Sequence, residues 1–154
     1  MKSLKLSASI KVFSIWVIIL MLSGVVTSCS KGDVSSAATS FEMGSMDSMP
    51  GEVKAAPTTV QQAYQFAVAN PEVLKKIPCY CGCEDLGHTS NYDCYISGVD
   101  SGGKVTYDSH ALGCSICVDI TQDTVRLMKQ GMTVPEIKAY IDQTYSQYGP
   151  SNIP

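Results

Sequence analysis

The sequence predicts a small, mainly α-helical and cysteine-rich domain, with a two-stranded β-hairpin inserted before the third helix. Three observations lead to this fold class. Apolar residues recur at helical spacing in several segments after residue 58. Between those segments, short runs of strand-like composition are separated by glycines. The 154 residues also contain seven cysteines, and cross-links or a metal would stabilise a loop-rich domain with only a modest core.

Residues 1–28 have the features of a secretory signal peptide. Lysines near the N-terminus precede an apolar run over residues 12–26, which is short for a membrane span. The run ends at Val26-Thr27-Ser28-Cys29, which resembles a bacterial lipobox, whose cysteine is diacylated and becomes the first residue of the mature chain. We expect the lipid on Cys29 to hold the protein at the extracytoplasmic face of the cell membrane. An ordinary signal peptide or an uncleaved anchor is the alternative.

Removal of the signal peptide changes the charge and the cysteine count. The chain has 11 basic and 14 acidic residues, and three of the lysines lie in residues 1–28, so the mature chain has eight basic residues and a net charge of −6. This acidity argues against a nucleic-acid partner and against electrostatic binding to anionic lipid. With Cys29 acylated, six cysteines are left for the folded domain.

Residues 29–57 are predicted to form a flexible tether, because they are rich in Ser, Ala, Gly and Met and lack periodicity. Methionine stands at every third position in Met43, Met46 and Met49. Thioethers are soft ligands that suit Cu(I), so these residues are candidate auxiliary metal ligands. The alternative is a tether that contains methionine without binding a metal.

Two helices are predicted to precede the main cysteine cluster. The first runs from Thr58 to about Ala69, with Thr58 or Thr59 as its N-cap and an apolar stripe along one side. The second is short, from Pro71 to Lys76, with proline at its first position. Pro78 ends this element and leads the chain into the cysteine cluster.

The segment from Glu84 to Ala111 is less regular. Its strand-like runs, Tyr92–Ser97 and Lys104–Tyr107, flank a glycine-rich turn and predict the hairpin. The first of these strands carries Cys94.

Two longer helices are predicted to follow the hairpin. One begins at the Cys114-x-x-Cys117 segment and runs to about Gln130, where Gly131 stops it. The last begins with a capping box over residues 133–136 and continues to about Tyr145. The predicted organisation is therefore a signal peptide (1–28), a tether (29–57), a cysteine-rich helical domain (58–148) and a C-terminal tail (149–154).

Three cysteines, Cys79, Cys81 and Cys83, occupy alternate positions in five residues. In an extended segment they would share one face, whereas a turn at Gly82 would gather their sulfurs. A disulfide between two of them would close a very small, strained ring, so we expect the cluster to bind a soft metal or to pair with distant cysteines. The candidate partners are Cys94, Cys114 and Cys117, with His88 and His110 between them.

The hexapeptide Pro78-Cys-Tyr-Cys-Gly-Cys83, the lipobox cysteine and a downstream Gly-Cys-x-x-Cys that opens a helix together resemble the PCYCGC-motif lipoproteins of Gram-positive bacteria. The resemblance covers roughly Thr59 to Tyr148 and implies an extracytoplasmic lipoprotein. It supplies a location and no activity, so the chemistry is argued from the residues.

The first functional hypothesis is metal binding by all six cysteines. Thiolate-rich sets suit Zn(II), Cu(I) or an iron–sulfur cluster; copper is favoured over zinc because of the tether methionines and because the alternating triplet is not a common zinc spacing. His110 is the preferred imidazole ligand because it leads into the helix that bears two cysteines, and His88 is auxiliary. Such a protein would act in metal handling as a carrier, a scavenger or an assembly factor. A partner protein that receives the ion is one option.

Two alternatives stay open. The six cysteines could form three disulfides that staple a structural or interaction domain without metal, since thiols outside the membrane tend to be oxidised. A thiol–disulfide oxidoreductase using Cys114 and Cys117 is the other, although no βαβ pattern precedes this pair. The sequence shows no Ser-His-Asp order, phosphate loop or pair of catalytic carboxylates, so no catalytic residue is assigned.

Overall fold

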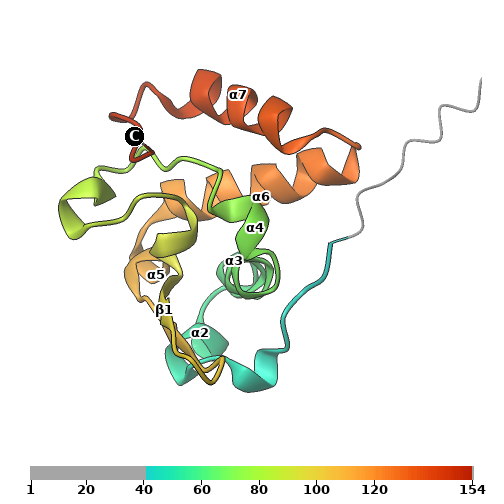
Figure 1. Ribbon diagram of the computed structural model, residues 1–154, viewed down its shortest axis with the longest axis vertical. Coiled ribbons are helices and arrows are strands. Elements are labelled where there is room, and N and C mark those ends of the chain that lie inside the picture. The colour runs from blue at the N-terminus through green and yellow to red at the C-terminus, as the bar shows by residue number, and fades with distance from the viewer. Residues whose placement is uncertain (1–40, 154) are drawn as a thin grey trace, which may run out of the picture. The chain divides into compact units, whose positions relative to one another are not determined.

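The computed structural model describes residues 41–153, and in this range it is mainly α-helical with one two-stranded antiparallel sheet. The predicted fold class is confirmed. The helices are α2 (Gly51–Ala55), α3 (Thr58–Ala69), α4 (Pro71–Leu74), α5 (His110–Gly113), α6 (Ser115–Lys129) and α7 (Val134–Tyr145) (Figure 1). The predicted signal peptide, the lipidation of Cys29 and the first part of the tether lie outside the described residues.

The core forms where three helices meet. Helix α6 lies between α7 and α3 and packs against both (Figure 1). Its buried side follows the predicted helical period and includes Ile120 and Leu127, which burial of apolar surface stabilises. Ile137 and Ile141 are the fully buried residues of α7. No helix within residues 41–153 is long and apolar enough to cross a membrane.

Most of the predicted helix boundaries agree with the structure. Helix α6 ends just before Gly131, whose φ of +82° is left-handed, and α7 begins with the predicted capping box between Thr133 and Glu136. One predicted cap is wrong: α3 begins at Thr58, so the N-cap position belongs to Pro57 and no side chain caps the helix. Proline ends the preceding loop there because its fixed φ suits the turn into a helix.

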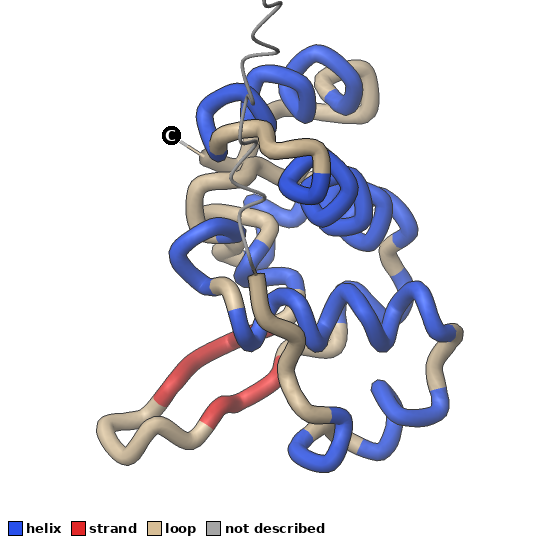
Figure 2. Tube along the Cα trace, turned by 90° about the vertical axis from the view of Figure 1, so that its right-hand side faces the viewer, coloured by secondary structure: helices blue, strands red, loops and turns tan. Residues whose placement is uncertain are grey.

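The hairpin joins β1 (Ile96–Val99) to β2 (Val105–Tyr107) in antiparallel register, between α4 and α5 (Figure 2). The first strand is shorter than predicted, so Cys94 is not on a strand. It ends the 3-10 helix η3 (Tyr92–Cys94). The Asp93 carboxylate accepts hydrogen bonds from the backbone N–H and the hydroxyl of Thr89, and this local bonding favours a turn over an extended strand.

Residues 41–57, which were predicted to belong to the tether, fold against α3 instead. They form the 3-10 helix η1 (Met46–Ser48) and α2, and they bury Met49 and Val53 in the core. The backbone of Gly44 donates to the carbonyl of Gln65 at 2.8 Å, and the Gln65 side chain donates back to the Gly44 carbonyl at 2.8 Å. The folded domain therefore begins before residue 58.

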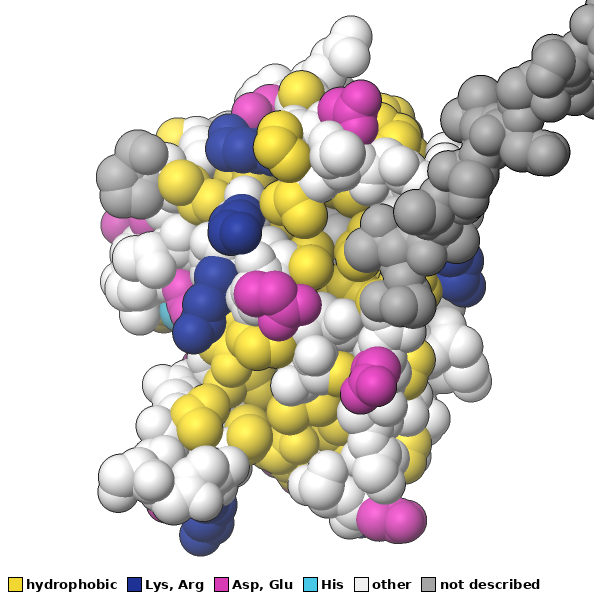
Figure 3. All heavy atoms as spheres, turned by 45° about the vertical axis from the view of Figure 1, so that its right-hand side comes forward, with side chains coloured by type: hydrophobic (Ala, Val, Ile, Leu, Met, Phe, Trp, Pro, Cys, Tyr) yellow, Lys and Arg dark blue, Asp and Glu magenta, His cyan; other side chains and the backbone are white. Residues whose placement is uncertain are grey.

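On the face shown in Figure 3, positive and negative side chains are interspersed among apolar ones.

Candidate metal centre

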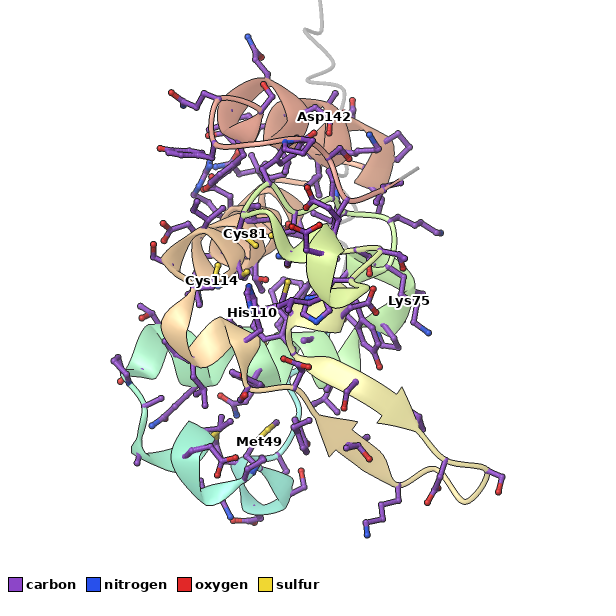
Figure 4. The ribbon with its side chains drawn as sticks, turned by 90° about the vertical axis from the view of Figure 1, so that its left-hand side faces the viewer. Met49, Lys75, Cys81, His110, Cys114 and Asp142 are labelled. Carbon is purple, nitrogen blue, oxygen red and sulfur yellow. The ribbon has the colours of Figure 1, made fainter. Side chains whose placement is uncertain are left out.

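The fold brings the six domain cysteines together from separate segments of the chain. Cys79 and Cys81 lie on the loop after α4, and Cys83 begins the 3-10 helix η2 (Cys83–Leu86). Cys94 comes from η3, and the remaining two come from the start of α6. Cys81, Cys114 and His110 converge from three elements in Figure 4. The sulfurs predicted to form one site are thus neighbours in space.

A turn at Gly82 gathers the cysteine triplet. Gly82 has a φ of +79°, a left-handed conformation that favours glycine, and it leads directly into η2. The chain then reverses before Gly87, which has a φ of +84°. The triplet is therefore not extended, and the turn that the sequence suggested is the conformation observed.

Apart from Cys114 and Cys117, whose sulfurs lie 2.7 Å apart, the sulfur–sulfur distances are close to those expected around a metal. Cys79 Sγ lies 3.4 Å from Cys81 Sγ and 3.6 Å from Cys117 Sγ, and the Cys81 and Cys117 sulfurs are 3.5 Å apart. Cys83 Sγ lies 3.8 Å from Cys94 Sγ. A tetrahedral ion with metal–sulfur bonds near 2.3 Å separates its sulfurs by about 3.8 Å. Small movements of the side chains would place the sulfurs of Cys79, Cys81, Cys94 and Cys117 on one ion.

The two histidines have different positions. His110 is the first residue of α5, its backbone N–H donates to Asp108 Oδ1 at 2.7 Å, and its Nε2 lies 3.5 Å from Cys81 Sγ. His88 is buried, packs edge-on against His110 at 5.3 Å between ring centroids and lies 3.8 Å from Asp108 Oδ2. His88 Nδ1 has no hydrogen-bond partner, and His88 belongs to none of the ligand sets found among residues 41–153.

The three methionines do not form an equivalent set. Met49 is 3% exposed in the apolar core, and Met46 is partly buried against that core, whereas Met43 is 42% exposed. Met49 also lies well away from Cys81 and Cys114 in Figure 4. Their regular spacing thus serves packing at two of the three positions, because the segment is folded and not a free tether.

Polar residues outside the predicted set of ligands hold the cysteine segments in place. The buried Asn91 side chain donates to the Cys117 carbonyl at 3.2 Å, and the Tyr95 hydroxyl donates to the same oxygen at 2.8 Å. Thr121 completes this group through a 2.7 Å bond to Asn91 Oδ1. These contacts fix the first turn of α6. Helical spacing could have placed Thr121 on the side of Cys117, but nothing in the sequence linked either residue to Asn91.

The C-terminal tail also contributes to the site. Asn152 is buried, its Oδ1 accepts from the Cys79 N–H at 2.7 Å and its backbone N–H donates to the Cys79 carbonyl at 3.1 Å. Its Nδ2 lies 3.5 Å from Cys83 Sγ, within reach of an N–H to sulfur hydrogen bond. The tail was predicted only as a terminal extension, since a single asparagine 73 positions from Cys79 gives no sequence signal.

The close packing of the thiols shifts their pKa values in opposite directions. The hydrogen bond with Cys117 lowers the pKa of Cys79 to about 4, and bonds from Cys114 and Cys117 lower the pKa of Cys81. The pKa of Cys94 is raised, and its hydrogen bond with the thiol of Cys117 is the largest cause. Within residues 41–153, no lysine or arginine bonds to any of these sulfurs. No lysine or arginine is thus available there to balance the charge of a thiolate, and a bound cation would do so.

The donor atoms form overlapping sets of four. In each set all four atoms lie within 4.8 Å of one another. The sets are Cys79, Cys81, Cys94 and Cys117; Cys81, His110, Cys114 and Cys117; and Cys81, Cys83, Cys94 and His110. Every predicted cysteine and His110 occurs at least once, and Cys81 occurs in all three sets. The cysteine groups are positioned to hold a metal ion.

The two alternatives to metal binding find less support in this geometry. All six cysteines are free in the described part of the chain, and the closest pair, Cys114 and Cys117, has its sulfurs 2.7 Å apart against about 2.05 Å in a disulfide. The Cys117 thiol donates to Cys114 Sγ, but Cys81 and burial outweigh it and raise the pKa of Cys114 to about 11. A low-pKa nucleophile would need the opposite shift. The described sheet is antiparallel and has no βαβ unit.

The fold and the site define a small helical domain that concentrates free thiols around one point, a class suited to binding soft metal ions. The chain belongs to the family described as proteins of unknown function with a PCYCGC motif, whose model matches residues 18–154. The family resemblance read from the hexapeptide is thus confirmed. No curated protein and no solved structure matches the chain.

Proposed function

We propose that the protein binds a soft metal ion, with Cu(I) favoured, through its six domain cysteines and His110. It does so as a lipoprotein anchored by Cys29 at the extracytoplasmic face of the membrane, where it carries, scavenges or delivers metal. The observation that carries the proposal is that each four-donor set gathers atoms from separate elements within 4.8 Å of one another. Buried thiols so close together gain from a shared cation.

The choice of copper depends on the ligand type and number. Soft thiolates suit Cu(I) and Zn(II), and the distances fit both ions. A structural zinc site is closed by four ligands, whereas here six sulfurs and an imidazole crowd one region. Cu(I) is a soft ion with a low coordination number, and several Cu(I) ions can share thiolate ligands. A surplus of thiolates therefore favours copper. The exposed Met43 remains an auxiliary candidate, whereas burial of Met49 argues against its use.

Metal handling also requires exchange, and the site has an accessible side. Cys81, Cys114 and His110 are partly exposed, whereas Cys79, Cys94 and Cys117 are buried. A partner's ligand can approach the exposed donors without unfolding the core. This asymmetry supports transfer to or from another protein more than permanent structural binding.

The test is anaerobic purification of the full-length lipoprotein in detergent, with elemental analysis and a count of free thiols. We expect bound copper and, after unfolding in chelator, six titratable thiols in the domain. A chain isolated free of metal, with all six cysteines paired, would contradict the proposal and leave the disulfide-stapled domain. Val99→Ala serves as a control, because Val99 is exposed and belongs to none of the donor sets, so its copper content should equal that of the wild type.

A further inference from the structure

We infer that the centre is built for two metal ions bridged by the sulfurs of Cys81 and Cys117, which extends the proposed metal binding and rests on it. Two of the four-donor sets share these two cysteines, whose sulfurs are 3.5 Å apart. The remaining donors divide into two pairs. Cys114 and His110 complete an outer site, and Cys79 and Cys94 complete an inner site.

The number of donors matches this arrangement. Two four-coordinate ions that share two ligands need six donors, and the two sets together provide five cysteines and one histidine. Three-coordinate ions would use the same bridges with one terminal donor each. The bridging sulfurs lie centrally: those of Cys81 and Cys117 are each within 3.6 Å of Cys79 Sγ, whereas Cys114 Sγ, 2.7 Å from Cys117 Sγ, would move outward to bind the same ion.

A single ion would leave the rest of the cluster without a partner. If one ion occupied the outer set, Cys79 and Cys94 would remain as thiols although both are 0% exposed. If one ion occupied the inner set, the Cys114 sulfur and His110 Nε2 would be left beside a bound cation. A second ion uses both pairs and leaves Cys83, a member of the third set, as a neighbouring thiol.

The two sites differ in access. The terminal ligands of the outer site, Cys114 and His110, are partly exposed, whereas those of the inner site are fully buried. Cys83 lies 3.8 Å from Cys94, on the inner side, where Asn152 Nδ2 also approaches its sulfur. The outer ion is therefore the exchangeable one, and the inner ion is retained.

The experiment is an anaerobic titration of the full chain with Cu(I) against a Cu(I) chelator, compared with Cys114→Ser and Cys81→Ser. Both replaced cysteines are partly exposed, so the variants are matched in burial. The wild type should bind two ions per chain and show metal–metal scattering in X-ray absorption. Cys114→Ser should weaken only the outer ion, which keeps the two bridging sulfurs and His110, whereas loss of a bridge in Cys81→Ser should weaken both ions. Circular dichroism verifies that each variant folds.

The outcomes separate the two proposals. A wild type that saturates at one ion, or shows no metal–metal scattering with two ions bound, overturns the bridged pair while metal binding stands. An equal loss of Cu(I) affinity in Cys114→Ser and Cys81→Ser also overturns the assignment of Cys81 as a bridge. A wild type that binds no Cu(I) in competition refutes the proposed function itself. If Cys81→Ser does not fold, the wild-type stoichiometry and scattering still decide.

Discussion

Asn152 is expected to stabilise the cysteine loop from the C-terminal tail, so Asn152→Ala should lower the free energy of unfolding of the metal-free protein. The alanine keeps the backbone bond to the Cys79 carbonyl but removes Oδ1, the acceptor 2.7 Å from the Cys79 N–H. Cys79 is 0% exposed, so water cannot replace that acceptor. A buried donor left without a partner costs about 1–3 kcal/mol.

The assay is thermal unfolding followed by circular dichroism, under reducing conditions with chelator present. For a domain of this size, 1 kcal/mol shifts the Tm by roughly 4–8 °C, so a decrease of about 4–24 °C is expected. Gln147→Ala is the control, because Gln147 is exposed and its side chain donates to the nearby Thr144 carbonyl, away from the cysteine loop. An Asn152→Ala protein that melts at the same temperature as Gln147→Ala would refute the reasoning.

Three further predictions concern the site. Gly82→Ala should lower the free energy of unfolding by about 1–2 kcal/mol, because φ is +79° there and a Cβ disfavours the left-handed region. Denaturant unfolding measures the loss, and Gly98→Ala, where nothing lies within 4 Å of an added Cβ, is the control. His110→Gln should weaken Cu(I) binding in competition with a chelator and His88→Gln should not, since only His110 belongs to the ligand sets; equal affinities would contradict this. Chelation should lower the Tm, because free metal at 100 times its Kd adds about 2.7 kcal/mol, and an unchanged Tm would show that the ion does not bind the native state.

The helices were predictable where local signals agreed with burial. The capping box at Thr133 and the left-handed Gly131 mark the turn between α6 and α7, and both occur where the sequence indicates. The segment before Thr58 was not predictable in the same way. Its composition resembles a linker, and its order depends on tertiary contacts of Gly44 and Met49 with α3, which local patterns do not reveal.

The sequence indicated that the cysteines lie together, but it did not indicate which residues position them. Crowding in the Cys79–Cys83 segment indicated that the sulfurs act together, and the turn at Gly82 gave the geometry. The residues that position them, Asn91 and Asn152, reach the cysteines from distant segments. Only folding brings them there, because a lone asparagine has no periodicity and no fixed spacing to a cysteine.

The spacing of the thiols also bears on whether oxidation or metal would occupy them at the extracytoplasmic location that we propose. A disulfide uses one partner for each sulfur, so a stapled domain needs its cysteines separated into pairs. Here Cys117 has three sulfur neighbours and Cys81 has two as well as His110. These shared neighbours allow Cys81 and Cys117 each to pair with more than one sulfur, whereas a metal ion can bind several of the sulfurs at once. The arrangement therefore favours metal as the occupant, and oxidation as the event that competes with it when the metal is absent.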